Sequence, residues 1–278
     1  MKTKIHGGNA IEILDYDLKK ITIKDAHQIM KYYFNHLVVV FRKQNLSPND
    51  MIDIAKIFGD PEFFDEKTVL QRSPMGVNGV QRVCAGFNED GSPRGLFGHD
   101  DDLDWHANRP SAELDRKPII FLYAAHDSAG SRISWANMAM AYDDLDEETK
   151  LFINNKKGIY GFEPNTYTKS FNIWKPHRNL EGQNFIRTNP IGNKGMFFPY
   201  YQFFGFKDVD ENTSEFYKKK LYEHAYQEKY FYHHDYEDGD VLLGDQWLTV
   251  HKRWAIELKN RMLYRVSMDW KNINLRDL

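Results

Sequence analysis

Cysteine is almost absent from this sequence, because Cys84 is the only one among 278 residues. A single cysteine excludes a disulfide framework and a cysteine-rich zinc site, and it suits a reducing compartment. Long apolar runs are missing too: the mean hydropathy is -0.66, and no stretch approaches the roughly 20 residues of a membrane helix. Residues 1–9 lack the apolar stretch and the small-residue cleavage site of a secretory signal. We therefore expect a soluble, cytoplasmic protein that does not bind a membrane.

A strong charge of one sign is also missing. The 37 Lys and Arg residues are balanced by 40 Asp and Glu residues, which gives a formal net charge of -3. Such a balance lacks the basic footprint of nucleic-acid-binding proteins. The sequence contains no repeat in the range of roughly 20–50 residues and no low-complexity linker. We expect residues 1–278 to form a single domain, and the sequence leaves open whether it forms a homo-oligomer.

Aromatic residues, in contrast, are abundant, with 19 Phe, 16 Tyr and 6 Trp. Together with β-branched residues they favour pleated surfaces and large cores. Short apolar runs predict strands over residues 37–41, 118–125, 131–136, 184–190, 195–198, 240–243 and 261–270. Capped periodic segments predict helices over residues 21–36, 48–58, 138–142, 147–154 and 212–228. Many short strands with a few helices indicate a mainly β fold, a sandwich or barrel with peripheral helices.

Two histidines stand out among the eleven by their context. His106 follows the acidic stretch 100–104, and Asn108 comes two residues later; His251 lies just past a predicted strand. Residues i and i+2 of an extended segment project to the same face, so both side chains can reach one ligand. Two histidines with an oxygen donor are typical of the facial triad of non-haem Fe(II) oxygenases. Spacing alone does not distinguish such a triad from ordinary core or surface histidines.

Four segments together resemble the taurine dioxygenase family, the TauD/TfdA-type Fe(II)- and 2-oxoglutarate-dependent dioxygenases. They are residues 41–48 with 58–59, residues 103–108, residues 185–190, and residues 239–251 followed by Arg261 and Arg265. The segments occur in the family's order and are spread over most of the chain. The resemblance implies a distorted double-stranded β-helix, or jelly-roll, core. It also implies an enzyme that uses Fe(II), 2-oxoglutarate and O2 on a small-molecule substrate.

The resemblance also implies roles for individual residues. By position, His106, Asn108 and His251 would form the metal site and the catalytic centre. Arg261 would bind the distal carboxylate of 2-oxoglutarate, because a guanidinium matches a carboxylate in two hydrogen bonds. Ser134 lies near the position where the family offers a hydroxyl to the same carboxylate, with neighbouring Ile133 as the alternative register.

Two further residues bear on the substrate. Arg265 occupies the place where taurine-type enzymes hold the acidic group of their substrate, and Asp102 lies near the place of its polar end. An arginine on one side and an acidic residue on the other would suit a zwitterionic, amino-acid-like molecule. The alternative is that Arg265 supports the cosubstrate and that Asp102 belongs to a solvated loop.

Position 108 departs from the family, which has Asp there. An amide oxygen is neutral and a weaker donor than a carboxylate, so Asn108 removes one negative charge from the expected metal site. Three alternatives follow: a His/Asn/His site, a substitute carboxylate from Asp101, Asp102 or Asp104, or a site that binds metal poorly.

Hydroxylation of an unactivated C–H bond is the default outcome that the resemblance implies. Halogenation or desaturation by the same radical chemistry is the first alternative, because position 108 is not a carboxylate. A non-catalytic jelly-roll binding protein is the second. Succinate formation from 2-oxoglutarate would separate the enzyme from the binding protein.

Overall fold

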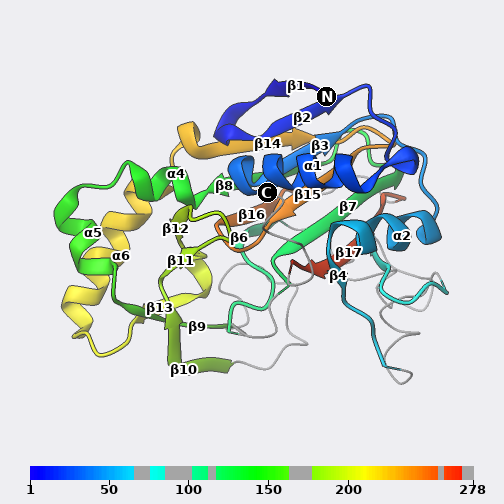
Figure 1. Cartoon of the computed structure of the whole chain (residues 1–278). Coiled ribbons are helices and arrows are strands. Elements are labelled where there is room, and N and C mark those ends of the chain that lie inside the picture. Colours follow the sequence, from blue (N-terminus) through cyan, green and yellow to red (C-terminus); the bar gives the residue numbers. More distant parts are fainter. Residues whose placement is uncertain (66–75, 85–101, 112–116, 163–176, 256–259, 271–278) are drawn as a thin grey trace.

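The protein is described by a computed structural model, which covers residues 1–65, 76–84, 102–111, 117–162, 177–255 and 260–270. Strands dominate this part of the chain, and five α-helices lie around them (Figure 1). The helices are α1 (Ile23–His36), α2 (Pro48–Phe58), α4 (Met138–Asp143), α5 (Glu147–Ile153) and α6 (Glu211–Ala225). Short 3-10 helices cover Gly7–Asn9, Leu18–Lys20, Tyr200–Gln202 and Glu228–Tyr230. The predicted mainly β class is therefore confirmed.

The larger of the two main sheets has eight strands in the order β1-β2-β3-β15-β7-β17-β4, with β5 paired to β17. Its strands are β1 (Lys2–Ile5), β2 (Ile11–Leu14), β3 (Val38–Phe41), β4 (Asp60–Pro61), β5 (Gln81–Cys84), β7 (Ile119–His126), β15 (Val241–Asp245) and β17 (Met262–Asp269). Neighbouring strands are antiparallel except β2 and β3, which are parallel.

The second main sheet has four antiparallel strands in the order β14-β8-β16-β6. They are β14 (Phe231–Asp235), β8 (Arg132–Asn137), β16 (Thr249–Arg253) and β6 (Leu103–His106). A smaller sheet contains β9 (Lys157–Phe162), β10 (His177–Asn184) and β13 (Phe203–Phe206), and β11 (Ile186–Thr188) pairs with β12 (Lys194–Met196). The last pair overlaps the strands predicted over residues 184–190 and 195–198.

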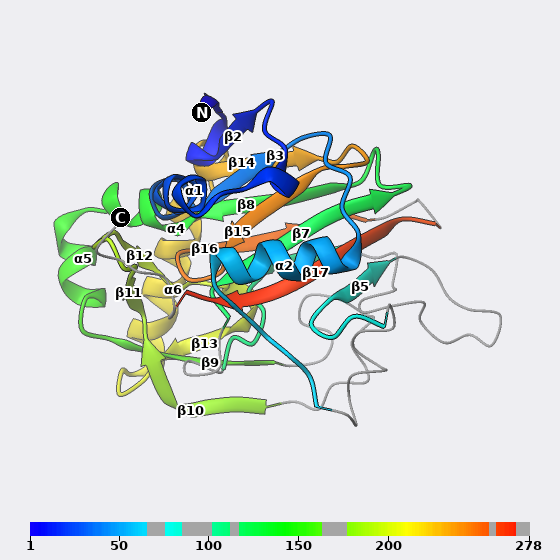
Figure 2. The same ribbon diagram turned by 45° about the vertical axis from the view of Figure 1, so that its right-hand side comes forward.

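The two main sheets pack face to face, because one apolar cluster draws residues from both. It joins Ile120, Leu122 and Leu263 of the larger sheet to Ile133 and Trp135 of the smaller one. The opposite face of the larger sheet packs against α1 and α2 in a separate cluster, and Figure 2 shows both helices lying over that sheet. This is the two-layered jelly-roll arrangement, and it leaves the space between the layers as the place for a site.

Local capping explains why the helices begin where the sequence predicts. Thr22 accepts a hydrogen bond from the backbone N–H of Asp25 at 3.1 Å, and Ser47 forms a reciprocal capping box with Asp50. Asn137 and Asp146 cap α4 and α5 in the same way. These helix predictions are confirmed within a few residues.

The helix predicted over residues 212–228 corresponds to α6, and its apolar residues are only partly buried. Leu221 and Ala225 are buried, whereas Phe216 is 62% exposed and Tyr222 is 36% exposed. Only part of this helix packs against the rest of the fold, so its periodic pattern overstates the buried stripe.

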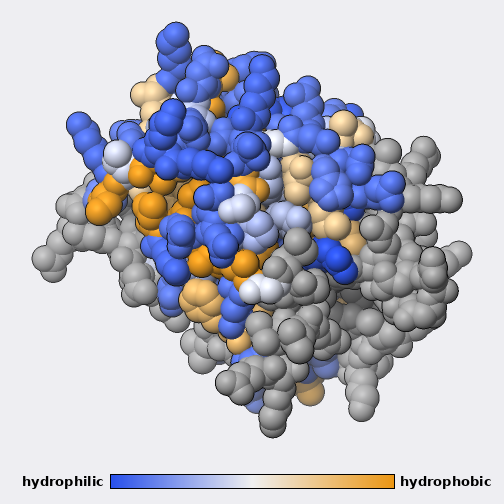
Figure 3. Space-filling model, turned by 90° about the vertical axis from the view of Figure 1, so that its right-hand side faces the viewer, coloured by the Kyte–Doolittle hydropathy of each residue, from blue (hydrophilic) through white to orange (hydrophobic). Residues whose placement is uncertain are grey.

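No helix among the described residues is long and apolar enough to span a bilayer. Figure 3 views the side that lies at the right of Figure 1, where apolar side chains gather left of the centre with polar side chains above and among them. The exposed face is therefore mixed in character, as is usual for protein surfaces.

Candidate active site

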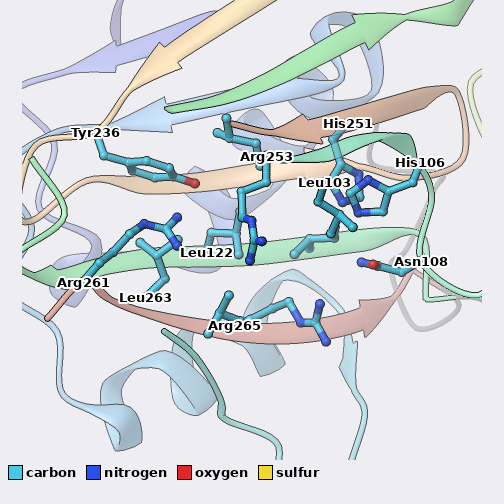
Figure 4. Close-up of a pocket in the computed structure, with 13 residues that line it drawn as sticks. Leu103, His106, Asn108, Leu122, Tyr236, His251, Arg253, Arg261, Leu263 and Arg265 are labelled. Atoms are coloured by element: carbon cyan, nitrogen blue, oxygen red, sulfur yellow. The ribbon is translucent and has the colours of Figure 1, made fainter. Parts of the chain in front are cut away.

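The site begins with two histidines that face each other across neighbouring strands. His106 on β6 and His251 on β16 are directly opposite in the antiparallel register, and their ring centroids lie 4.2 Å apart. Both rings are buried and line a pocket between the two main sheets (Figure 4). The structure thus brings together the two histidines that the sequence analysis singled out.

A bulge in β6 turns its residues toward this pocket. His251 pairs with His106 and Arg253 pairs with Leu103, so two steps along β16 correspond to three along β6. An extra residue in one strand lets side chains three apart share a face. Leu103 and His106 consequently both line the pocket, which strict alternation would forbid.

Both imidazoles are held in the form that binds metals. Burial lowers the pKa of His106 to about 4, and the pKa of His251 lies well below its usual range, first because of burial and next because of His106. The rings are therefore neutral at pH 7. The Nδ1 of His106 lies 2.6 Å from the backbone oxygen of Asp104. A carbonyl only accepts, so Nδ1 carries the proton and Nε2 carries the lone pair.

Asn108 reaches the same pocket and is positioned by two buried glutamines. Its backbone N–H donates to Oε1 of Gln246 at 3.2 Å, and the preceding N–H of Ala107 donates to Oε1 of Gln202 at 2.8 Å. Figure 4 shows the Asn108 side chain pointing into the pocket beside the two histidines. Neither glutamine was singled out in the sequence, since no local pattern connects residues so far apart in the chain.

Arg261 lies at the far end of the pocket from the histidines (Figure 4) and is 2% exposed. Its Nε donates to Oγ of Ser131 at 2.9 Å, and its guanidinium lies 5.6 Å from the centre of the Tyr236 ring. Its Nη1 is buried without a hydrogen-bond partner among the described residues. Burial lowers the pKa of Arg261. A buried cation with an unused donor is a natural site for a carboxylate.

The prediction that Ser134 shares this end of the pocket is wrong. Ile133 lines the pocket and Trp135 belongs to the same inter-sheet cluster, so the intervening Ser134 points to the other face of β8. There its Oγ lies 2.5 Å from Nδ1 of His233 and accepts from Nε1 of Trp254 at 2.7 Å. The hydroxyl that contacts Arg261 belongs to Ser131, which lies just before the strand.

The two serines offer a matched test. Ser131→Ala is expected to weaken 2-oxoglutarate binding by about 2- to 12-fold, because a hydrogen bond that orients Arg261 contributes roughly 0.5–1.5 kcal/mol. Ser134→Ala should leave the affinity unchanged, since its side chain faces away. Calorimetric titration of both variants with 2-oxoglutarate measures the difference, and an equal effect in the two variants would refute the assignment.

Two more arginines line the pocket. Arg265 donates from Nε and Nη2 to Oε1 of Gln81, at 2.8 and 2.6 Å. Leu263 and Arg265 alternate along β17 and Arg261 lies just before its first residue, and all three line the pocket. Arg253 lies two residues after His251 and also lines the pocket. It was not singled out in the sequence. The i, i+2 spacing that pointed to Asn108 would have found it.

Asp102 does not lie in the pocket, so its predicted contact with substrate is wrong. Its carboxylate accepts from the backbone N–H of Ala255 at 2.5 Å and lies 3.6 Å from Nζ of Lys252. Asp104 also pairs with Lys252, at 3.4 Å. Neither carboxylate is among the pocket residues. Asp101, the third candidate, lies outside the described residues.

The residues present fit a divalent metal and a carboxylate cosubstrate. Nδ1 of His251 is buried without a hydrogen-bond partner among the described residues. The second imidazole therefore has a ring nitrogen that no described protein group uses. The described residues hold no group of three or more His, Cys, Asp and Glu that could bind a metal. Within that part of the chain, Asn108 is the amide that lines the pocket together with the two histidines.

A jelly-roll with paired histidines and a buried arginine in one pocket is typical of 2-oxoglutarate-dependent dioxygenases, and this is the class of the protein. The chain belongs to the taurine catabolism dioxygenase TauD, TfdA family, whose sequence model matches residues 6–267. The predicted family is confirmed. An (S)-phenoxypropionate/alpha-ketoglutarate-dioxygenase of Sphingobium herbicidovorans is 23% identical over 251 residues, which cover 85% of this chain and 84% of that protein.

Solved structures share the fold. A taurine dioxygenase from Burkholderia xenovorans superposes with a TM-score of 0.73 at 20% identity, over 96% of this chain and 90% of that chain. The structure of AAD-2 in complex with Mn(II) and N-oxalylglycine superposes with a TM-score of 0.69 at 19% identity, over 98% of each chain. The predicted jelly-roll core is therefore confirmed.

Proposed function

We propose that the enzyme holds Fe(II) between His106 and His251, binds 2-oxoglutarate at Arg261, and hydroxylates an unactivated C–H bond of a small polar molecule. The observation that carries this proposal is the meeting of the histidine pair and the buried Arg261 in one pocket. The Mn(II) and N-oxalylglycine bound to AAD-2, a relative in fold, support a metal and a 2-oxo acid.

Fe(II), when bound, would couple decarboxylation of 2-oxoglutarate by O2 to oxidation of the substrate, with succinate and CO2 as the other products. The chain's own residues bind and orient the reactants. His106 offers Nε2, because Nδ1 is committed to the backbone oxygen of Asp104. Arg261, fixed by Ser131, aligns the distal carboxylate of 2-oxoglutarate. Leu122 and Leu263 on the pocket wall exclude water from the reacting centre.

Arg265 is the substrate-binding residue in this proposal, since it faces the pocket from β17, four residues after Arg261. The acidic partner expected for a zwitterion is not found, because the described lining residues include no Asp or Glu. The Sphingobium relative is an (S)-phenoxypropionate dioxygenase, which supports an organic acid rather than a zwitterion as the substrate.

Asn108 is proposed to face the metal as the third protein group of the site. Asn108→Asp is expected to tighten Fe(II) binding by about tenfold or more, since a charged oxygen replaces a neutral one in a pocket rich in arginine. Asn108→Ala should weaken binding if the amide oxygen coordinates the metal. Anaerobic titration with Fe(II) tests both variants, and three equal affinities would make Asn108 a bystander.

The proposed function is tested by succinate formation. The purified protein, loaded anaerobically with Fe(II) and 2-oxoglutarate, is exposed to O2, and succinate is quantified against samples that lack metal or O2. Succinate that depends on both supports the enzyme. If 2-oxoglutarate binds but no succinate forms even when a panel of small organic acids is added as substrates, the non-catalytic binding protein is the correct alternative.

A further inference from the structure

The hydroxyl of Tyr236 is a polar group at the Arg261 end of the pocket that the proposed function leaves unused. Tyr236 lies directly after β14, lines the pocket and is 1% exposed. Its Oη is buried without a hydrogen-bond partner among the described residues. A buried tyrosine hydroxyl usually has a partner, and leaving one unpaired costs free energy. The partner of this hydroxyl is therefore expected to be a ligand.

Tyr236 and Arg261 are both fixed to Ser131. The backbone N–H of Tyr236 donates to the backbone oxygen of Ser131 at 2.9 Å, and Nε of Arg261 donates to its Oγ, also at 2.9 Å. The Arg261 guanidinium lies 5.6 Å from the centre of the Tyr236 ring, and Figure 4 shows the hydroxyl directed into the pocket near that guanidinium. Nη1 of Arg261 also lacks a partner among the described residues. Two unused donors thus lie at one end of the pocket.

A buried histidine packs against the ring of Tyr236 and holds its orientation. His234 is fully buried, and the two ring centroids lie 4.8 Å apart with the rings at 79°. Nε2 of His234 lies 3.0 Å from Oδ2 of Asp240, and its Nδ1 lies 2.8 Å from the hydroxyl oxygen of Tyr232. A carboxylate only accepts, so Nε2 carries the proton and Nδ1 accepts from Tyr232. Because His234 is fixed at both nitrogens, the ring of Tyr236 packs against a rigid surface.

The hydroxyl of Tyr236 is available as a donor. Burial raises the pKa of Tyr236, so the phenol is protonated at pH 7. Its hydrogen bond is strongest to an ionised acceptor. A carboxylate has two oxygens and several lone pairs, so it can accept from a guanidinium and from a hydroxyl at the same time.

We propose that Tyr236 is a specificity-determining residue whose hydroxyl donates to the distal carboxylate of the cosubstrate beside Arg261. The site then distinguishes a 2-oxo acid that ends in a carboxylate from one that ends in a methyl group, because only the carboxylate satisfies both unused donors. This inference rests on the proposed function, which places the distal carboxylate of 2-oxoglutarate at Arg261.

The test compares 2-oxoglutarate with 2-oxopentanoate, which has the same carbon chain but ends in a methyl group, on the protein loaded with Mn(II). Anaerobic calorimetry measures the dissociation constant of 2-oxoglutarate, and competition against it measures that of 2-oxopentanoate. Tyr236→Phe should weaken binding of 2-oxoglutarate by about tenfold or more, because a hydrogen bond to a charged group is lost. It should not weaken binding of 2-oxopentanoate, since a methyl group accepts no hydrogen bond.

Tyr232→Phe is the matched control, because it also removes one buried phenol hydroxyl from the same strand region. That hydroxyl is paired with His234, and Tyr232 is not among the pocket residues. Tyr232→Phe should therefore lower the unfolding temperature and bind 2-oxoglutarate like the parent. Tyr236→Phe should not lower the unfolding temperature of the ligand-free protein, since its hydroxyl has no protein partner to lose. Affinity lost without stability lost distinguishes a hydroxyl that binds a ligand from a structural one.

Each contrary outcome has a defined meaning. Parent-like affinity of Tyr236→Phe for 2-oxoglutarate would overturn the inference and leave the proposed function intact. Equal losses for both 2-oxo acids would also overturn it, because the hydroxyl would then act on a part that the two ligands share. A lower unfolding temperature of ligand-free Tyr236→Phe would show that the hydroxyl serves the fold instead. Failure of the parent to bind 2-oxoglutarate would overturn the proposed function, and this inference with it.

Discussion

Replacing His106 or His251 with alanine is expected to abolish stoichiometric binding of Fe(II). The two rings lie 4.2 Å apart, both are buried, and both are neutral at pH 7, so each offers a lone pair to the same ion. Loss of an outer-shell partner of a metal ligand weakens binding by about 10- to 100-fold. Loss of a ligand itself should exceed about 100-fold in anaerobic calorimetry with Fe(II), or with Mn(II) as a stable substitute.

A third histidine variant separates the site from a general effect of histidine loss. His126→Ala changes a side chain that is 54% exposed at the end of β7, and it should bind metal like the parent. Unfolding midpoints of the metal-free proteins check that the alanine variants at 106 and 251 remain folded. Parent-like affinity in either of these folded variants contradicts the metal site.

Arg261→Ala should raise the dissociation constant of 2-oxoglutarate by about 30- to 4000-fold. Truncating one partner of a buried, hydrogen-bonded charge pair costs about 2–5 kcal/mol, which corresponds to that range at 25 °C. The geometry supports a large effect, because the guanidinium is 2% exposed and its Nη1 lacks a partner among the described residues. Fluorescence or calorimetric titration with 2-oxoglutarate in the presence of Mn(II) measures the change.

Metal affinity is the internal control for this variant, since Arg261 lies at the other end of the pocket from the histidines. Arg261→Ala should therefore bind Mn(II) nearly as the parent does. Arg265→Ala is the matched arginine variant and should affect 2-oxoglutarate much less. A large effect at Arg265 with none at Arg261 would mean that the two arginines have exchanged roles.

Much of the secondary structure can be predicted because its signals are local. The caps at Thr22, Ser47 and Asn137 act on backbone groups two or three residues away, so a short window of sequence contains the whole interaction. The apolar run of β3 is similarly self-contained. β14 and β16 are among the strands that were not predicted, because histidines and charged residues interrupt the apolar residues in their sequences FYHHD and TVHKR. Such strands lack the continuous or alternating apolar pattern from which a strand is predicted.

Ser134 illustrates why the local sequence does not identify which side chains of a strand face the pocket. Alternation in β8 places Ile133 and Ser134 on opposite faces whatever the fold, but it does not say which face meets the pocket. Pairing of β8 with β16 and packing against the larger sheet make that choice, and they select the face of Ile133. The hydroxyl near Arg261 then comes from Ser131, which lies just before the strand.

By itself, the sequence determined the family, the α-helices and several of the strands. It also singled out the two histidines, Arg261 and Arg265 as candidates. These features depend on local motifs and their order. Only the tertiary structure decided that His106 and His251 lie opposite each other, that Asp102 and Asp104 pair with Lys252 outside the pocket, and that Arg253 lies inside it. Each of these depends on strand register and on a bulge in β6, which arise from pairing between distant segments. A shift of one residue in that pairing would send a different set of side chains into the pocket.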